Sequence, residues 1–132
     1  MTASKLPSGG CACGQFRYSA EAEPEFSFLC QCTICQKSSG TGHAAAFILP
    51  AEQFKSEGQL NWYDTTAESG NVVSHGFCAT CGTPVMNKNS RHKEVVFVTA
   101  GSLDNPDLFT PTKVLYRDTA RPWDLSDPQA EA

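Results

Sequence analysis

The stretch CQCTIC, residues 30–35, places three thiols in a C-x-C-x-x-C spacing and decides the fold expected of this chain. The 132-residue sequence has seven cysteines, and the other four form a C-x-C pair, Cys11 and Cys13, and a C-x-x-C pair, Cys78 and Cys81. A structural zinc takes four ligands in a tetrahedron, whereas a catalytic zinc takes three protein ligands and keeps one position open. Seven thiols in these groups therefore predict two zinc sites that share the cysteines as four and three.

The most economical partition gives the local triplet to one zinc ion and joins the two remote pairs around the other. The ligands so assigned are Cys30, Cys32 and Cys35 for the first ion, and Cys11, Cys13, Cys78 and Cys81 for the second. We expect the four-cysteine site to be structural, because it closes a long loop of the chain. We expect the three-cysteine site to be catalytic, since its free position can accept water, hydroxide or a thiol. With only three ligands, this site is also the one we expect to be partly occupied.

Two alternatives for the triplet stay open at this point. His43 or His75 can supply a fourth ligand, which would make the triplet a second structural site without reactivity. A redox-active C-x-x-C pair is less well supported, because a thioredoxin-type motif expects a βαβ context that this sequence lacks. The coordination of the triplet ion therefore distinguishes an enzyme from a noncatalytic zinc-binding β module for protein interaction.

Composition and charge limit the other classes of function. The odd number of cysteines and the absence of an apolar signal segment in residues 1–10 indicate a reducing, cytoplasmic location rather than a disulfide framework. No run approaches the roughly 20 apolar residues of a membrane span, so we expect no membrane association. The net charge is −4, which argues against nucleic acid as a partner.

Short alternating apolar runs predict an all-β fold with at most one short helix. Besides the runs around Phe16 and Phe28, β-branched and aromatic residues gather at residues 44–49, 60–63, 72–77, 85–87, 94–100 and 113–116. Residues 50–55 give the one helical hint, because Pro50 suits a first turn. We expect a single zinc-stapled domain over residues 1–123 and a disordered acidic tail over residues 124–132, where apolar residues become sparse.

The motifs resemble those of the glutathione-dependent formaldehyde-activating enzyme (GFA) family, whose relatives include centromere protein V. The matching segments are GGCACG at residues 9–14, CQCTIC at 30–35, FCATCG at 77–82 and GSLD at 101–104. In their order and separation they cover the chain from about Gly9 to Trp123. Gln31 departs from the family pattern, which often has histidine there, and Gln36 stands where arginine is frequent.

This resemblance implies an antiparallel fold of the β-tent type, with the same division of the seven cysteines between a structural and a catalytic zinc. It also implies carbon-sulfur lyase activity, in which glutathione and formaldehyde combine to S-hydroxymethylglutathione. A small thiol and an aldehyde are thus the expected partners. The resemblance does not fix the substrates, because members of one fold act on different molecules.

Several other residues are candidates for contact with substrate. The dense basic cluster of the sequence, a candidate clamp for the carboxylates of glutathione, consists of Lys88, Arg91, His92 and Lys93. Lys37 is a nearer candidate beside the triplet, although a solvated side chain is an equal expectation for it. Trp62, Tyr63 and Trp123 are candidates to line a pocket, but our first expectation is that they fill the core, as aromatic residues in small sheet proteins usually do.

Overall fold

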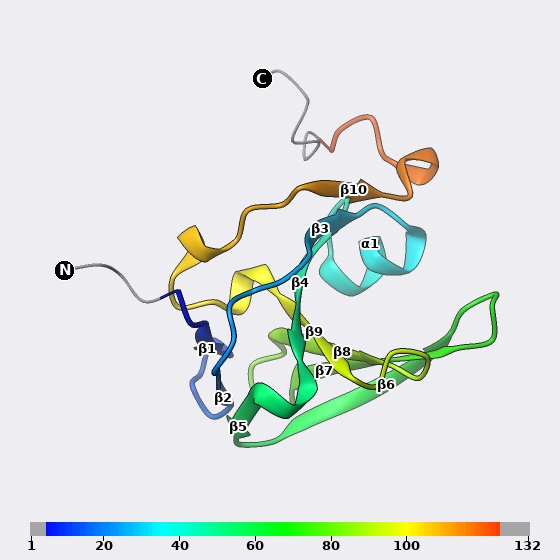
Figure 1. The fold of residues 1–132 in the computed structure, drawn as a ribbon. Coiled ribbons are helices and arrows are strands. Elements are labelled where there is room, and N and C mark those ends of the chain that lie inside the picture. The colour runs from blue at the N-terminus through cyan, green and yellow to red at the C-terminus, as the bar shows by residue number, and fades with distance from the viewer. Residues whose placement is uncertain (1–4, 125–132) are drawn as a thin grey trace.

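The computed structural model describes residues 5–124, and two β-sheets account for most of this part of the chain (Figure 1). The smaller sheet has the strand order β1-β2-β5 and the larger has the order β10-β3-β4-β9-β8-β7-β6. The strands are β1 (Ser8–Gly10), β2 (Arg17–Ala20), β3 (Ser27–Cys30), β4 (Ala44–Pro50), β5 (Phe54–Glu57), β6 (Leu60–Thr66), β7 (Val72–Cys78), β8 (Pro84–Asn89), β9 (Val95–Thr99) and β10 (Lys113–Leu115). The α-helix found in residues 5–124 is α1 (Thr33–Ser39), and short 3-10 turns lie at Ala51–Gln53, Ala100–Ser102, Pro106–Leu108 and Arg117–Thr119.

Almost all strand pairs are antiparallel, as the sequence predicts. The exception is β10, which runs parallel to β3 and pairs Val114 with Leu29. In Figure 1 the three-stranded sheet lies at the lower left and β10 with α1 at the upper right, at the other end of the molecule. The chain that leaves the core after β9 thus returns to cover the edge of β3.

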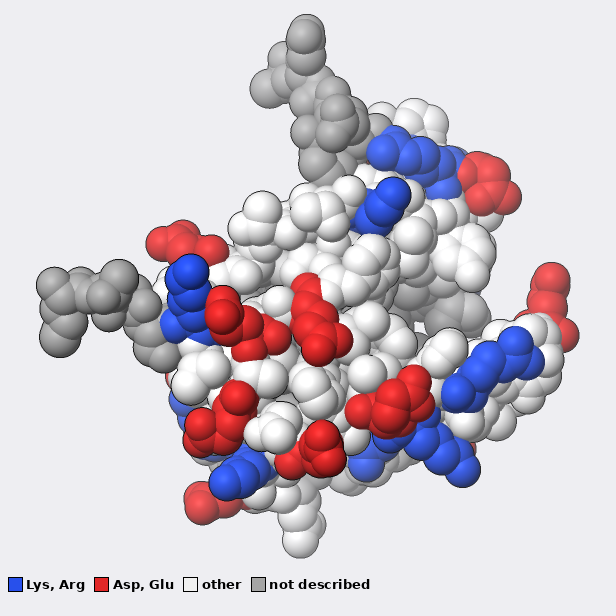
Figure 2. Space-filling model, viewed as in Figure 1, with Lys and Arg blue, Asp and Glu red and all other residues white. Residues whose placement is uncertain are grey.

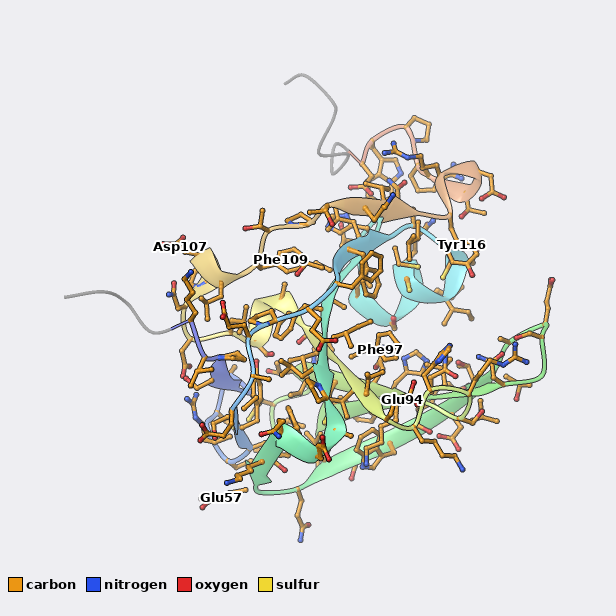
Figure 3. The ribbon with its side chains drawn as sticks, viewed as in Figure 1. Glu57, Glu94, Phe97, Asp107, Phe109 and Tyr116 are labelled. Atoms are coloured by element: carbon orange, nitrogen blue, oxygen red, sulfur yellow. The ribbon has the colours of Figure 1, made fainter. Side chains whose placement is uncertain are left out.

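The larger sheet buries a different cluster of side chains on each of its faces. Val96 and Val98 of β9 belong to the main core between the two sheets, where Phe47 and Leu49 are fully buried. Phe97, between these two valines, packs instead in a smaller cluster with Phe28 and the cysteines of the triplet. It projects from β9 on the side of α1 (Figure 3). This alternation is the period of two expected of a strand that is covered on both sides.

The all-β prediction is confirmed, but the helix lies elsewhere than residues 50–55. That segment forms a 3-10 turn at Ala51–Gln53 and then strand β5, whose residues pair with β2 along the whole strand. Pairing with a neighbouring strand satisfies backbone groups that a helix of barely more than one turn cannot. The helix is α1, which begins directly after Cys32 and contains Cys35. Gly40 ends it with a left-handed φ of 77°.

No helix among the described residues is long and apolar enough to cross a membrane. On the face seen in Figure 2, acidic and basic side chains are interspersed and lysine and arginine form no continuous patch. Residues 125–132, most of the predicted acidic tail, lie outside the described residues.

Gly58 joins β5 to β6 at a point of close approach between two chain segments. Its φ is +98°, and a Cβ atom there would lie 2.1 Å from the carbonyl oxygen of Gln15. Gly70, in the turn before β7, has a φ of +92° and nothing within 4 Å of the same position. A substitution at Gly70 therefore measures the cost of backbone strain alone, whereas one at Gly58 measures that cost together with a steric overlap.

We expect Gly70→Ala to lower the free energy of unfolding by about 1–2 kcal/mol, the cost of a left-handed non-glycine residue. Gly58→Ala carries the same strain and in addition pushes Gln15 aside, which adds about 1–3 kcal/mol. Urea denaturation followed by circular dichroism measures both. Equal losses in the two variants would show that the close approach to Gln15 contributes nothing.

Candidate metal centres

Two turns far apart in the sequence bring four cysteines together beneath the three-stranded sheet. Cys11 and Cys13 follow β1, whereas Cys78 ends β7 and Cys81 lies in the turn after it. All four sulfurs lie within 4.8 Å of one another. The Sγ atom of Cys13 is 3.6 Å from that of Cys11 and 3.7 Å from that of Cys78. Four free thiols at this spacing have the chemistry of a tetrahedral zinc site.

Several N–H groups point at the sulfur of Cys78. The backbone nitrogens of Thr80 and Cys81 lie 3.3 Å and 3.4 Å from it, and Nε2 of Gln15 donates over 3.1 Å. These donors favour the thiolate, so the backbone N–H of Cys81 first, and then Gln15, lower the pKa of Cys78 to about 7. Hydrogen bonds from Thr83 lower the pKa of Cys81 to about 5. The donors around Cys78 and Cys81 therefore stabilise the deprotonated form of these two thiols, which a metal requires.

The second cluster is built where β3 passes into α1. Cys30 is the last residue of β3, Cys32 caps the N-terminus of α1 and Cys35 lies in the helix. Their sulfurs lie within 4.8 Å of one another, and the sulfur of Cys32 accepts a hydrogen bond of 3.4 Å from the backbone nitrogen of Cys35. Cys30 is buried, whereas Cys32 and Cys35 are half-buried and so remain open to the solvent side.

Charge in the triplet gathers on one sulfur when no cation balances it. Hydrogen bonds from the Cys30 and Cys35 thiols lower the pKa of Cys32 to about 2. The same contact with Cys32 raises the pKa of Cys30 to about 11, and contacts with Cys30 and Cys32 raise that of Cys35 as well. The three thiols therefore oppose one another's deprotonation, and a cation bound among them would remove that opposition.

Neither histidine considered as a fourth ligand joins the triplet. Among residues 5–124, no histidine, aspartate or glutamate adds a ligand atom to its three sulfurs within 4.8 Å. The Nδ1 atom of His43 lies 3.1 Å from Oδ1 of Asp124, and Nε2 of His75 lies 3.0 Å from Oγ1 of Thr65. Both histidines thus have other partners.

A set of hydrogen bonds from the C-terminal part of the chain holds the loop of the triplet. The carbonyl oxygen of Gln31 accepts from Nε2 of Gln36 over 2.9 Å and from Oγ1 of Thr119 over 2.8 Å. The Gln36 amide also donates to the carbonyl oxygen of Thr119, over 2.9 Å, and the Gln31 side chain donates to Asp124 over 3.2 Å. We call Gln31, Gln36, Thr119 and Asp124 the loop brace. Sequence reasoning noticed only the two glutamines, as departures from the family pattern, and gave no signal for their partners.

The basic residues singled out in the sequence do not converge on either cysteine cluster. Lys88 and Lys93 line a pocket beside Trp62, whereas His92 lies 3.7 Å from Glu94. Lys37 is exposed in the last turn of α1, and Arg91 is exposed in the turn after β8.

The prediction that three aromatic residues fill the core is wrong. Trp62, Tyr63 and Trp123 are 42%, 66% and 63% exposed. The core is filled instead by residues such as Phe16 and Phe47.

Comparison with known proteins places the chain in a family. The model of the family described as glutathione-dependent formaldehyde-activating enzyme (GFA) matches residues 6–119, and the chain belongs to this family. The structure is also similar to the crystal structure of a Rhodobacter sphaeroides protein, with a TM-score of 0.63 and 22% sequence identity over 81% of this chain and 98% of that one. A search of curated proteins found no match. The structural likeness supports the fold, and the family model connects the chain to a chemistry of thiols and aldehydes.

We expect the loop brace to set the metal affinity of the triplet. Gln36→Ala keeps all three cysteines but removes two hydrogen bonds that position their loop, so zinc affinity at this site should fall about 10-fold or more. Competition with a chromophoric chelator measures the affinity, and Lys37→Ala, an exposed change on the same helix, is the control. Identical affinities in both variants and the wild type would mean that the brace does not position the sulfurs.

Proposed function

We propose that this protein is a zinc-dependent enzyme of the carbon-sulfur lyase type, which joins a small thiol such as glutathione to formaldehyde or a related aldehyde. One observation carries the proposal: the sulfurs of Cys30, Cys32 and Cys35 converge without a fourth protein ligand, whereas the other cluster has four. Membership of the GFA family supports the same reaction class. The seven free thiols suit a reducing compartment, and we propose the cytoplasm.

The residues present fit two zinc ions with different tasks. The four sulfurs of Cys11, Cys13, Cys78 and Cys81 complete a tetrahedron by themselves, which suits a structural ion. The three sulfurs of the triplet leave one position for an external ligand. Zinc bound there would lower the pKa of a substrate thiol and hold its sulfur as a nucleophile.

The chain supplies the shape and the environment of this site. Cys30 is fixed by β3 and Cys35 by α1, so the loop brace and the helix cap set the angle between the sulfurs. Phe28 and Phe97 meet edge to face, with ring centroids 6.3 Å apart, and pack in the cluster that contains the triplet. Their apolar rings exclude water on that side, which strengthens electrostatic interactions at the sulfurs.

The proposed reaction is balanced without a further reactant. The thiol sulfur attacks the carbonyl carbon and a carbon-sulfur bond forms, while the carbon-oxygen double bond becomes a single bond. The proton lost by the thiol ends on the resulting oxygen, which gives an S-hydroxymethyl thioether. The reverse sequence cleaves the same adduct.

We expect Cys32→Ser to lose about one equivalent of zinc and the acceleration of adduct formation, but to keep the fold. The reason is that Cys32 lies outside the main core, whereas Cys81→Ser removes one of four ligands that join distant segments and should lower the melting temperature strongly. Metal analysis gives the zinc content, and NMR with labelled formaldehyde compares condensation with glutathione against the spontaneous rate and against other small thiols.

The outcomes of this experiment separate the proposal from a noncatalytic module. If wild-type protein with two zinc ions does not accelerate adduct formation with any thiol, the chain is a zinc-binding β module for protein interaction. If Cys32→Ser keeps both zinc ions and full activity, the assignment of the triplet is wrong.

We also expect a chelator to remove the two zinc ions in two phases. The three-cysteine site should release its ion first, because it has one thiolate fewer and accepts competing ligands directly. Stopped-flow absorbance with a chromophoric chelator follows the release, and the Cys32→Ser variant should lack the fast phase. A single phase that releases both ions together, or a fast phase that persists in the variant, would contradict this expectation.

A further inference from the structure

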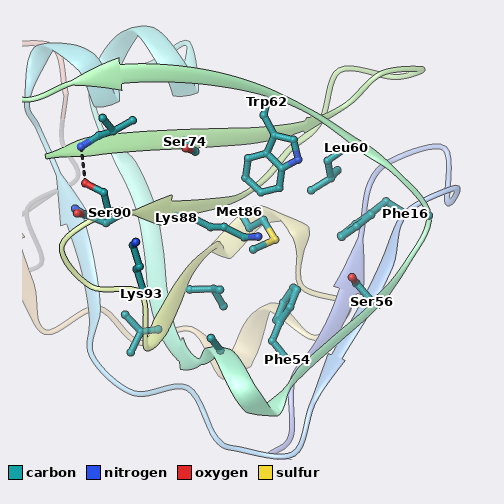
Figure 4. Close-up of a pocket in the computed structure, with 16 residues that line it drawn as sticks. Phe16, Phe54, Ser56, Leu60, Trp62, Ser74, Met86, Lys88, Ser90 and Lys93 are labelled. Carbon is teal, nitrogen blue, oxygen red and sulfur yellow. Dashed lines mark hydrogen bonds between the residues drawn. The ribbon is translucent and has the colours of Figure 1, made fainter.

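A pocket of about 690 Å³ lies between the larger sheet and the strand β5 (Figure 4). Its apolar lining includes Phe16, Phe54, Trp62 and Met86. Lys88 and Lys93 supply the charged part of the lining. In Figure 4, Lys88 reaches across the pocket towards Met86, and Lys93 lies on the side away from Phe16.

The larger sheet separates this pocket from the triplet. Met86 and Lys88 of β8 line the pocket, and so does Val96 of β9. Phe97, the next residue of β9, packs on the other face in the cluster that contains Cys32 and Cys35. A molecule in the pocket therefore cannot reach the triplet through the sheet, and the pocket is distinct from the site proposed for the thiol and the aldehyde.

The charges around the pocket are unusual for this protein. The whole chain has 14 acidic and 10 basic residues, yet the lining contains two lysines and neither aspartate nor glutamate. The ion pairs among residues 5–124 do not include Lys88 or Lys93. Lys88 instead places its Nζ atom 5.0 Å from the centre of the Trp62 ring. An ammonium group held over an aromatic ring and without a carboxylate partner is available to a ligand that carries negative charge.

The floor of the pocket accepts a flat ring as well as a charge. Gly76 of β7 lies beneath Trp62, and a Cβ atom there would come within 2.9 Å of the indole, so the glycine lets this ring lie against the strand. Trp62 remains 42% exposed, and Phe54 and Met86 face the same space. Apolar walls with a few polar groups are the usual composition of small-molecule sites.

We propose that this pocket is a second ligand site, which binds a small organic anion with an aromatic body, such as an aromatic carboxylate. The carboxylate lies between Lys88 and Lys93, and the ring packs on Trp62, Phe54 and Met86. This inference does not depend on the reaction proposed above, because no cysteine takes part in it. A peptide such as glutathione, which carries two carboxylates but no aromatic body, leaves the apolar walls unused.

Three probes separate the contributions of charge and ring. Isothermal titration of the zinc-loaded full chain compares 2-naphthoate with the neutral 2-naphthalenemethanol and with acetate, which has the charge but no ring. We expect naphthoate to bind, naphthalenemethanol to bind about 10-fold more weakly because it forms no charge-assisted hydrogen bond, and acetate not to bind measurably. Amide shifts in NMR spectra should map naphthoate to β6, β8 and the turn before β9.

Variants then test each residue of the pocket. Lys88→Met and Lys93→Met keep an unbranched side chain but lose the charge, so each should weaken naphthoate binding about 10-fold and leave naphthalenemethanol binding unchanged. Trp62→Leu should weaken both aromatic probes. Lys113→Met, on the distant β10, is the matched control and should bind as the wild type does. Circular dichroism checks that each variant is folded.

Other results would overturn the proposal. Equal binding of naphthoate and naphthalenemethanol, or unchanged naphthoate affinity in both lysine variants, would show that the lysines do not recognise an anion. Loss of naphthoate binding in Cys32→Ser would place the ligand at the triplet instead. A dimer in sedimentation experiments that Trp62→Leu dissociates, with no naphthoate binding in the wild type, would identify the pocket as an interface between two copies of the chain.

Discussion

The repulsion between closely spaced sulfurs is the constraint on which this fold depends. Sulfur atoms 3.6 Å and 3.7 Å apart, contributed by the turn after β1 and by the end of β7, cannot all carry charge unless a cation lies among them. A divalent ion bound among these sulfurs would replace the repulsion with attraction. It would then cross-link the turn after β1 to the turn after β7. Each of these segments is short and exposes much of its backbone, so apolar burial alone holds them weakly.

The two clusters use the same ligand, the cysteine sulfur, but they differ in how the chain positions it. The four-cysteine cluster joins distant segments and has several N–H donors at Cys78, which suits the structural ion proposed for it. The triplet is local to one turn, and its orientation comes from outside, through the contacts of Gln31 and Gln36 with the C-terminal part of the chain. In the function proposed here, fixed sulfurs and a free position would combine rigidity with access for a substrate.

The sequence was sufficient to predict most of the strands and the grouping of the cysteines, because both depend on spacing within short segments. The position of the helix could not be predicted in this way. Cys32 caps α1 with its sulfur, a role usually filled by serine, threonine, aspartate or asparagine, so the ordinary signal of a helix start was missing. Residues 54–57 became a strand because β2 lies beside them, which is information that no local pattern contains. The pocket beside Trp62 likewise depends on how β5 approaches the larger sheet.

Because β10 pairs with β3, the edge of β3 stays uncovered during synthesis until β10 has been made. β3 carries four buried residues, and the segment that covers its outer edge comes more than eighty positions later in the order of translation. Until that segment emerges, an apolar strand with unpaired backbone groups faces the crowded interior of the cell. A nascent or clipped chain that lacks β10 therefore exposes an aggregation-prone edge at the strand that carries Cys30. The protein's resistance to aggregation thus depends on β10.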